Sequence, residues 1–126
     1  MPNAVERAVR ANLSEGERLH TPAQAAAFTI ARLDHDALVL LLGKKEAWTP
    51  IAWSCLEGIP EFLRGRGWVL IGSVFSTSSE PGSLDSYLKT CLKRATAGWV
   101  AVVLERAGVV EIDRTRPVRV RLAAGR

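Results

Sequence analysis

The stretch LERAGVVEIDRTRPVRVRL, residues 104–122, carries the strongest structural pattern in the sequence. Gly108 follows an apolar segment with helical spacing, and glycine at such a point is typical of the left-handed residue that ends a helix. Beyond it, apolar and charged residues alternate on both sides of Thr115-Arg116-Pro117, as they do in the strands of a hairpin. The stretch therefore predicts a helix end followed by antiparallel strands at 109–113 and 118–122.

In one pairing register of this hairpin, apolar residues lie opposite each other on one face and opposite charges lie opposite each other on the other face. An apolar face and a face of opposite charges result together when the cross-strand pairs are Val110 with Leu122, Ile112 with Val120, Glu111 with Arg121 and Asp113 with Arg119. A shift by one residue would destroy both patterns, so we expect this register.

Two helices are expected before the hairpin. Ser83 opens a predicted helix over 83–92, whose leucines share one face, and a second helix over 96–107 ends at Gly108. The competing interpretation makes 99–105 a strand and 99–122 a three-stranded meander, because a short apolar run is ambiguous by its period alone.

This order of helix, short link, helix and hairpin resembles the winged helix-turn-helix family of DNA-binding proteins. The resemblance covers residues 83–122, and its most specific part is LERAGVVEI, since the second helix in that family commonly ends with Leu-Glu-x-Ala-Gly before an aliphatic pair. A helix over 49–65 and a strand over 68–75 would complete the family's order. That strand and the loop after it are longer here than is usual in the family.

The resemblance implies that the second helix enters the major groove and that the hairpin lies against the DNA backbone. The groove-facing start of the helix would then consist of Lys93, Arg94, Thr96, Gly98 and Trp99.

Two arginines at the hairpin tip are the expected phosphate contacts. Arg114 and Arg116 lack an acidic cross-strand partner in the favoured register, whereas the arginines further along the last strand have one. The alternative is an ordinary edge hairpin whose arginines discourage aggregation.

The second helix is unusually apolar for one that reads DNA. Trp99, Val102 and Val103 occupy positions that are polar in many members of the family. Three explanations for this apolar face compete. The upstream hairpin packs on it, a dimer partner covers it, or the segment is a strand and not a helix. We expect Trp99 to be at least half buried. If the face is instead exposed, the chain is a protein-interaction module that docks through the helix over 96–107.

The upstream residues predict further helices and a second hairpin. Residues 1–20 are expected to be a polar segment with a short exposed helix, and Thr21-Pro22 is typical of a helix start. A hairpin over 27–43 is favoured over one long helix at 22–43. Thr49-Pro50 predicts a helix that Gly58 and Pro60 kink or split, with Trp48 and Trp53 in the core. The predicted domain is a single unit over 21–126, with a helix, hairpin and helix module at 21–67 and a winged-helix-like half at 68–126.

Composition limits the classes of function. Residues 1–88 hold 8 Lys/Arg and 10 Asp/Glu, a net charge of −2, whereas residues 89–126 hold 9 and 3, a net charge of +6, and such a concentration of charge suits a polyanion. No apolar run has the length of a membrane span, and the first residues lack the apolar region of a signal peptide. Cys55 and Cys91 are expected to be reduced thiols in a cytoplasmic protein.

No cofactor, metal site or catalytic signature is expected, so the chain is predicted not to be an enzyme. The expected fold is α+β, with an N-terminal helix and β-hairpin module joined to a winged-helix-like C-terminal half. The expected function is non-catalytic binding of double-stranded DNA with a preference for sequence or structure. The protein would be a small regulator or the DNA-targeting module of a larger machine.

Overall fold

The computed structural model describes residues 3–21, 27–43, 45–71, 82–92, 96–115 and 118–123. Within them the chain forms helices and two antiparallel sheets, so the expected α+β class is confirmed. The elements in chain order are α1 (Ala4–Asn12), β1 (Arg18–His20), β2 (Ala27–Leu33), β3 (Ala37–Leu42), β4 (Ala47–Ala52), α2 (Trp53–Glu57), α3 (Ile59–Leu63), β5 (Val69–Leu70), α4 (Leu84–Leu88), α5 (Ala97–Arg106), β6 (Val110–Asp113) and β7 (Arg119–Leu122).

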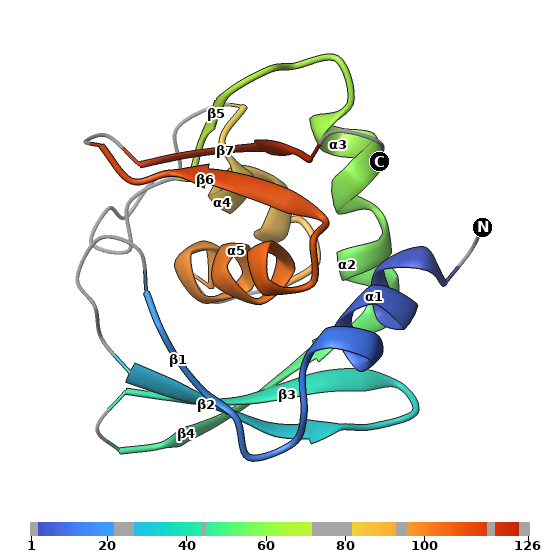
Figure 1. Ribbon diagram of the computed structural model, residues 1–126, viewed down its shortest axis with the longest axis vertical. Coiled ribbons are helices and arrows are strands. Elements are labelled where there is room, and N and C mark those ends of the chain that lie inside the picture. The colour runs from blue at the N-terminus through green and yellow to red at the C-terminus, as the bar shows by residue number, and fades with distance from the viewer. Residues whose placement is uncertain are drawn as a thin grey trace.

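The two sheets lie on opposite sides of α5 (Figure 1). One sheet has the strand order β1-β2-β3-β4, and the other has the order β5-β7-β6. The helices α2 and α3 lie beside α5 between the two layers, and α1 packs against α2 and α5. One core of buried apolar side chains joins these elements, which places α5 at the centre of the molecule.

The four-stranded sheet is built around the apolar strand β3. The expected hairpin is confirmed as β2 and β3, and the N–H of Asp34 closes its turn by donating to the carbonyl of Ala37 at 3.0 Å. The competing long helix over 22–43 is excluded by the paired strands that occupy 27–33 and 37–42. Residues 22–26, which include Pro22 of the expected helix start, lie outside the described residues.

The helix start expected at Thr49-Pro50 is wrong, because both residues belong to β4. This strand is an edge of its sheet, where a proline without an N–H is tolerated. The helix begins at Trp53, which is buried, whereas Trp48 lies on the outer face of the sheet with 54% of its surface exposed. The expectation that both tryptophans lie in the core therefore holds for Trp53 alone.

The helix α1 is part of the core, so the expectation of an exposed helix in the first 20 residues is wrong. Val5 and Val9 on its inner face are buried. Asn3 makes no side-chain cap, and the carboxylate of Glu57 accepts instead from the N–H groups of Val5, at 3.0 Å, and Glu6, at 2.8 Å. A residue of α2 thereby satisfies two of the donors that every helix start leaves free.

Gly58 separates α2 from α3, so the expected split of this helix is confirmed. A side chain at this position would lie 2.1 Å from the hydroxyl oxygen of Tyr87. The ring of Tyr87 also contacts that of Phe62, with their centroids 5.0 Å apart. The glycine therefore allows α4 to pack closely against the junction of the two short helices.

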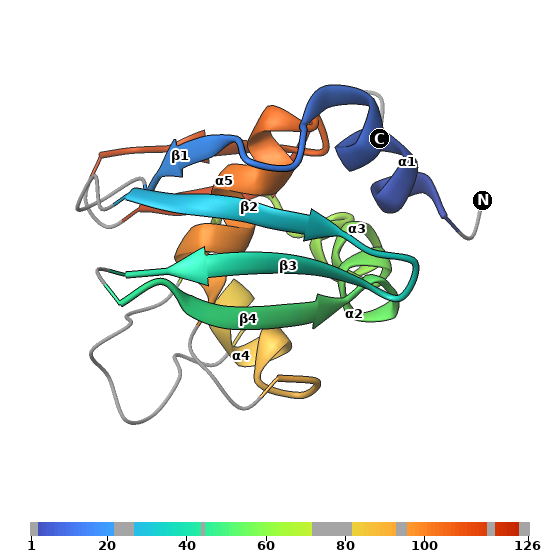
Figure 2. The same cartoon turned by 90° about the horizontal axis from the view of Figure 1, so that it is seen from below.

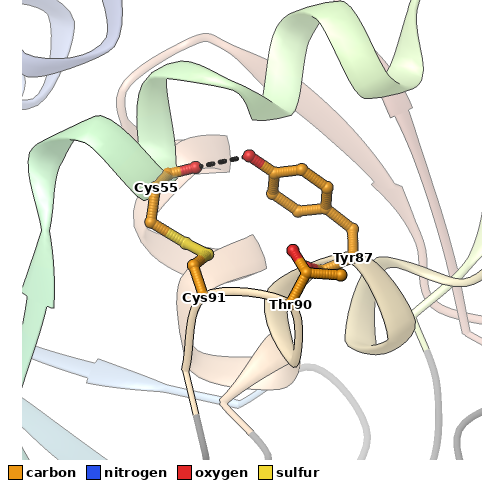
Figure 3. Close-up of a disulfide and its surroundings, with 4 residues drawn as sticks. All are labelled: Cys55, Tyr87, Thr90 and Cys91. Atoms are coloured by element: carbon orange, nitrogen blue, oxygen red, sulfur yellow. Dashed lines mark hydrogen bonds between the residues drawn. A yellow bond between two sulfur atoms is a disulfide. The ribbon is translucent and has the colours of Figure 1, made fainter.

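A disulfide joins Cys55 of α2 to Cys91 in the turn after α4, with the two Cα atoms 6.2 Å apart (Figure 3). The expectation of two reduced thiols is therefore wrong. Beside the disulfide, the phenol of Tyr87 donates to the carbonyl of Cys55 at 2.9 Å. The helix α4, which begins after Ser83 and ends at Leu88, is shorter than expected and is held to α2 by both contacts.

The second sheet contains the hairpin in the expected register. Ile112 pairs with Val120, and the flanking pairs match as well: Val110 with Leu122, Glu111 with Arg121 and Asp113 with Arg119. The strand expected over 68–75 is described only up to residue 71, and its Val69 pairs with Val120 from the other side. β7 is consequently the central strand.

Candidate nucleic-acid interface

The helix expected over 96–107 is confirmed as α5, which excludes the competing strand at 99–105. Its apolar face is covered by the chain itself: Val102 and Val103 are 4% and 0% exposed, and α1 and β1 contact the helix. At its C-terminal end, Arg106 forms an ion pair of 2.6 Å with Glu17, and Asn12 donates to the carbonyl of Ala107 at 3.4 Å. The cover therefore comes from within the chain, from α1 and β1 rather than from the upstream hairpin, now β2 and β3, that the sequence led us to expect.

The burial of α5 decides what its predicted groove-facing residues can do. Thr96 is 1% exposed, and its hydroxyl has no hydrogen-bond partner among the described residues. Trp99 is mostly buried against the core, as expected, and its indole nitrogen reaches neither solvent nor a partner. Gly98 has open space where a side chain would begin. Lys93 and Arg94 lie outside the described residues.

Arg114 is engaged by an acid, which corrects the expectation that it is free for phosphate. Its guanidinium donates to both carboxylate oxygens of Glu105, at 2.7 and 2.6 Å, and this hydrogen bonding raises the pKa of Arg114. The expectation rested on the absence of an acidic partner for Arg114 across the hairpin, whereas Glu105 lies on α5. Arg116, the other predicted tip contact, lies outside the described residues.

A second carboxylate organises the start of the hairpin turn. Asp113 accepts from the hydroxyl of Thr115 at 2.6 Å and from its N–H at 2.9 Å. These two hydrogen bonds, with a smaller contribution from the charge of Arg119, lower the pKa of Asp113. The carboxylate therefore remains ionised close to the phosphate-binding tip that the sequence predicts.

Every cation described within residues 89–126 has a carboxylate nearby. Arg121 bonds to Glu111 at 2.6 Å and stacks 4.4 Å over the ring of Trp68. The others are Lys89 with Asp85 at 3.1 Å, Arg106 with Glu17, Arg114 with Glu105, and Arg119 opposite Asp113. The remaining cations of this region are Lys93, Arg94, Arg116 and Arg126, none of which is among the described residues.

Four features of the structure were not expected from the sequence. They are the exposure of Trp48, the cap that Glu57 provides, the pairing of Arg114 with Glu105, and the disulfide. The segment Ala47–Ala52 does carry a signal for the first of these, since its Thr49 and Ile51 alternate with Trp48 and Pro50. The others join residues far apart in sequence or on different elements, where no local spacing indicates the contact.

The described residues contain no group of three or more histidine, cysteine, aspartate or glutamate side chains placed to hold a metal ion. Over the same parts of the chain, no helix has both the length and the apolar character needed to cross a membrane. No protein-family model matches the sequence, and neither a curated protein nor a solved structure matches it.

Proposed function

We propose that this protein binds double-stranded DNA without catalysis, by contacting phosphates through the hairpin tip and the basic residues before α5. It acts as a small regulator or as the DNA-targeting module of a larger machine. A cytoplasmic location belongs to this proposal.

The observation that carries the proposal is the order and pairing of the elements between residues 53 and 122. Helices α2 and α3 are followed by β5, α4, α5, β6 and β7, and the strand after the last turn lies between the other two. This is the order that the resemblance to winged helix-turn-helix proteins leads one to expect. In such proteins the last two strands form a wing that contacts the DNA backbone.

The distribution of charge supports the same partner. The net charge of +6 over residues 89–126 attracts a polyanion. Because the described cations of this region have carboxylates nearby, the proposal assigns the phosphate contacts to Lys93, Arg94 and Arg116. In the sequence, Lys93 and Arg94 precede Thr96, the N-cap residue of α5, and Arg116 falls between β6 and β7.

The burial of α5 limits the mode of binding. A helix reads bases only when one of its faces enters the major groove, and α5 has Val102 buried and is in contact with α1 and β1. We therefore propose contacts to the backbone that depend little on sequence. The same burial leaves the face of Trp99, Val102 and Val103 without the exposed surface that docking to a partner or a second copy would require.

A fluorescence-anisotropy titration with a labelled duplex tests the proposal. The triple variant Lys93→Ala, Arg94→Ala and Arg116→Ala should bind more weakly than the wild type. Its plot of log affinity against log salt concentration should be shallower by about 2 to 3, since each lost phosphate contact removes roughly 0.9 from the slope.

The matched control removes three exposed cations from residues 1–88, by Arg7→Ala, Arg64→Ala and Arg66→Ala. It changes the net charge by the same amount and should keep the wild-type slope within about 1. An equal loss of affinity in both variants would show that only total charge matters, and the assignment of the interface would be wrong.

A further inference from the structure

No other helix or strand of the described residues lies over the outer face of the four-stranded sheet (Figure 2). Figure 2 shows the strands β1 to β4 in front of the helices, with no other described element covering them. The alternate side chains of these strands point inward to the core, among them Phe28, Leu40 and Ile51. We call the opposite set the outer sheet face, and its members include Arg18, His20, Thr29, Leu41, Trp48 and Pro50.

One row of this face crosses all four strands. The pairing places Arg18 beside Thr29, Thr29 beside Leu41, and Leu41 beside Trp48. Neighbouring strands are about 4.8 Å apart, so the two ends of the row are separated by roughly 14 Å. An aromatic ring and a guanidinium thus lie at opposite ends of one line across the sheet.

The charged residues in the four strands are all arginines. None of the four strands contains aspartate or glutamate. Arg18 is exposed, and no carboxylate among the described residues pairs with it, whereas Arg32 is engaged by Asp34 at 2.8 Å. Lys45, close to Trp48 in the turn before β4, is also exposed and has no partner in the described parts of the chain. Glu46, in the same turn, is the nearest acid in sequence.

The apolar part of the face is small and dominated by one ring. Trp48 is 54% exposed, whereas Val39 is 2% exposed and Leu41 is partly buried. A single exposed indole, on a face whose strands carry arginine and no acid, offers less to an apolar protein surface than to a base, which has a π-face of its own. Pro50 removes a backbone donor from the edge strand, which disfavours the addition of a strand from a second copy.

We propose that the outer sheet face binds single-stranded nucleic acid, with a base stacked on Trp48 and a phosphate on Arg18. Sequence-tolerant binders of single strands combine a stacking aromatic side chain with cations that follow the backbone, and both are present in this row. The surface is separate from the wing, so the inference goes beyond the binding of duplex DNA and does not rest on it.

The test is an anisotropy titration of the wild type and variants with a labelled oligothymidylate of about 15 nucleotides at low salt. Trp48→Ala should weaken binding by about 5- to 150-fold, and Trp48→Phe should restore most of the affinity because phenylalanine also stacks. Arg18→Ala should make the salt slope shallower by about 0.7. Since Trp48 is an exposed side chain, each variant should keep the melting temperature of the wild type.

Trp68→Ala is the matched control, because Trp68 is the other large exposed apolar side chain among the described residues, at 41%, and lies near the second sheet. It should leave single-strand affinity unchanged. Equal losses in Trp48→Ala and Trp68→Ala, or no binding of the oligonucleotide by the wild type, would overturn the proposal. Sedimentation of the wild type as a dimer that Trp48→Ala converts to a monomer, without oligonucleotide binding, would assign the face to self-association instead.

The two proposals can fail separately. The variant with Lys93, Arg94 and Arg116 replaced should retain the affinity for the oligothymidylate, and Trp48→Ala should retain the affinity for the duplex. Loss of single-strand binding in the first variant alone would show that the single strand occupies the wing, which contradicts the assignment to the outer sheet face.

Discussion

Removing the disulfide through Cys55→Ala and Cys91→Ala should lower the free energy of unfolding by about 4 kcal/mol. The two cysteines are 36 residues apart in sequence, and closing a loop of that length in the unfolded chain costs about 13 cal/mol/K of entropy. At 25 °C this entropy corresponds to roughly 4 kcal/mol of free energy. The chain without the disulfide loses this entropy when it folds, whereas the cross-linked chain has already lost it in the unfolded state. In a domain of this size the loss should lower the melting temperature by roughly 10–20 °C.

Urea unfolding of three samples measures this contribution: the oxidised wild type, the wild type in excess dithiol, and the double variant. The reduced wild type should match the double variant to within about 1 kcal/mol, because the cross-link contributes mainly through the unfolded chain. Thiol labelling of the denatured, unreduced protein should find no free cysteine. Two labelled cysteines, or equal stabilities of all three samples, would refute the reasoning.

Burial raises the pKa of Tyr87 above its ordinary value of 10.0. The contribution of the neutral phenol to the free energy of unfolding is therefore fully present below about pH 10 and is lost as the pH rises through the folded-state pKa. Tyr87→Phe should remove this loss of stability at alkaline pH. Urea unfolding at pH 8 and pH 11 checks this, and an equal decline in both proteins would contradict it. Glu57→Ala should cost about 0.5–2 kcal/mol, because two N–H groups at the start of α1 lose their acceptor; faster hydrogen exchange at Val5 and Glu6 would report it. Replacing both Arg114 and Glu105 by alanine leaves the net charge unchanged and should leave duplex affinity unchanged, since the pair neutralises itself; a tenfold loss would show that Arg114 contacts phosphate.

The hairpin was predictable because its two faces impose the same register. A single alignment of β6 and β7 pairs apolar residues on one face and opposite charges on the other, and the structure has that alignment. The helix α5 was predictable for a related reason, since Gly108 marks its end and takes a positive φ of 79°. In both places a local pattern and a tertiary contact require the same conformation.

The four-stranded sheet was only half predictable. Thr49-Pro50 has the composition of a helix start, but pairing with β3 extends the strand through Pro50 to Ala52. β1 is too short to show an alternating pattern, and it exists because Leu19 packs opposite Phe28 on the inner face. Tertiary pairing outweighs local propensity in both strands.

The candidate site was the least predictable part. The sequence indicates which cations lack a partner across the hairpin, but Arg114 is neutralised by Glu105 from another element. The apolar face of α5 is compatible with a core helix or with a docking face, and only its position between the two sheets distinguishes them (Figure 1). The pairing of Cys55 with Cys91 likewise depends on how α2 packs against α4.

The measurement that tests the central claim most directly is the salt dependence of wild-type binding to two duplexes of unrelated sequence. Backbone contact through Lys93, Arg94 and Arg116 predicts measurable affinity at about 50 mM salt, a linear log–log plot with a slope of about −3, and equal affinity for both duplexes. No binding at that salt concentration would contradict the account. A strong preference for one sequence would contradict backbone contact, because base reading would require α5 to leave the position it occupies between the sheets.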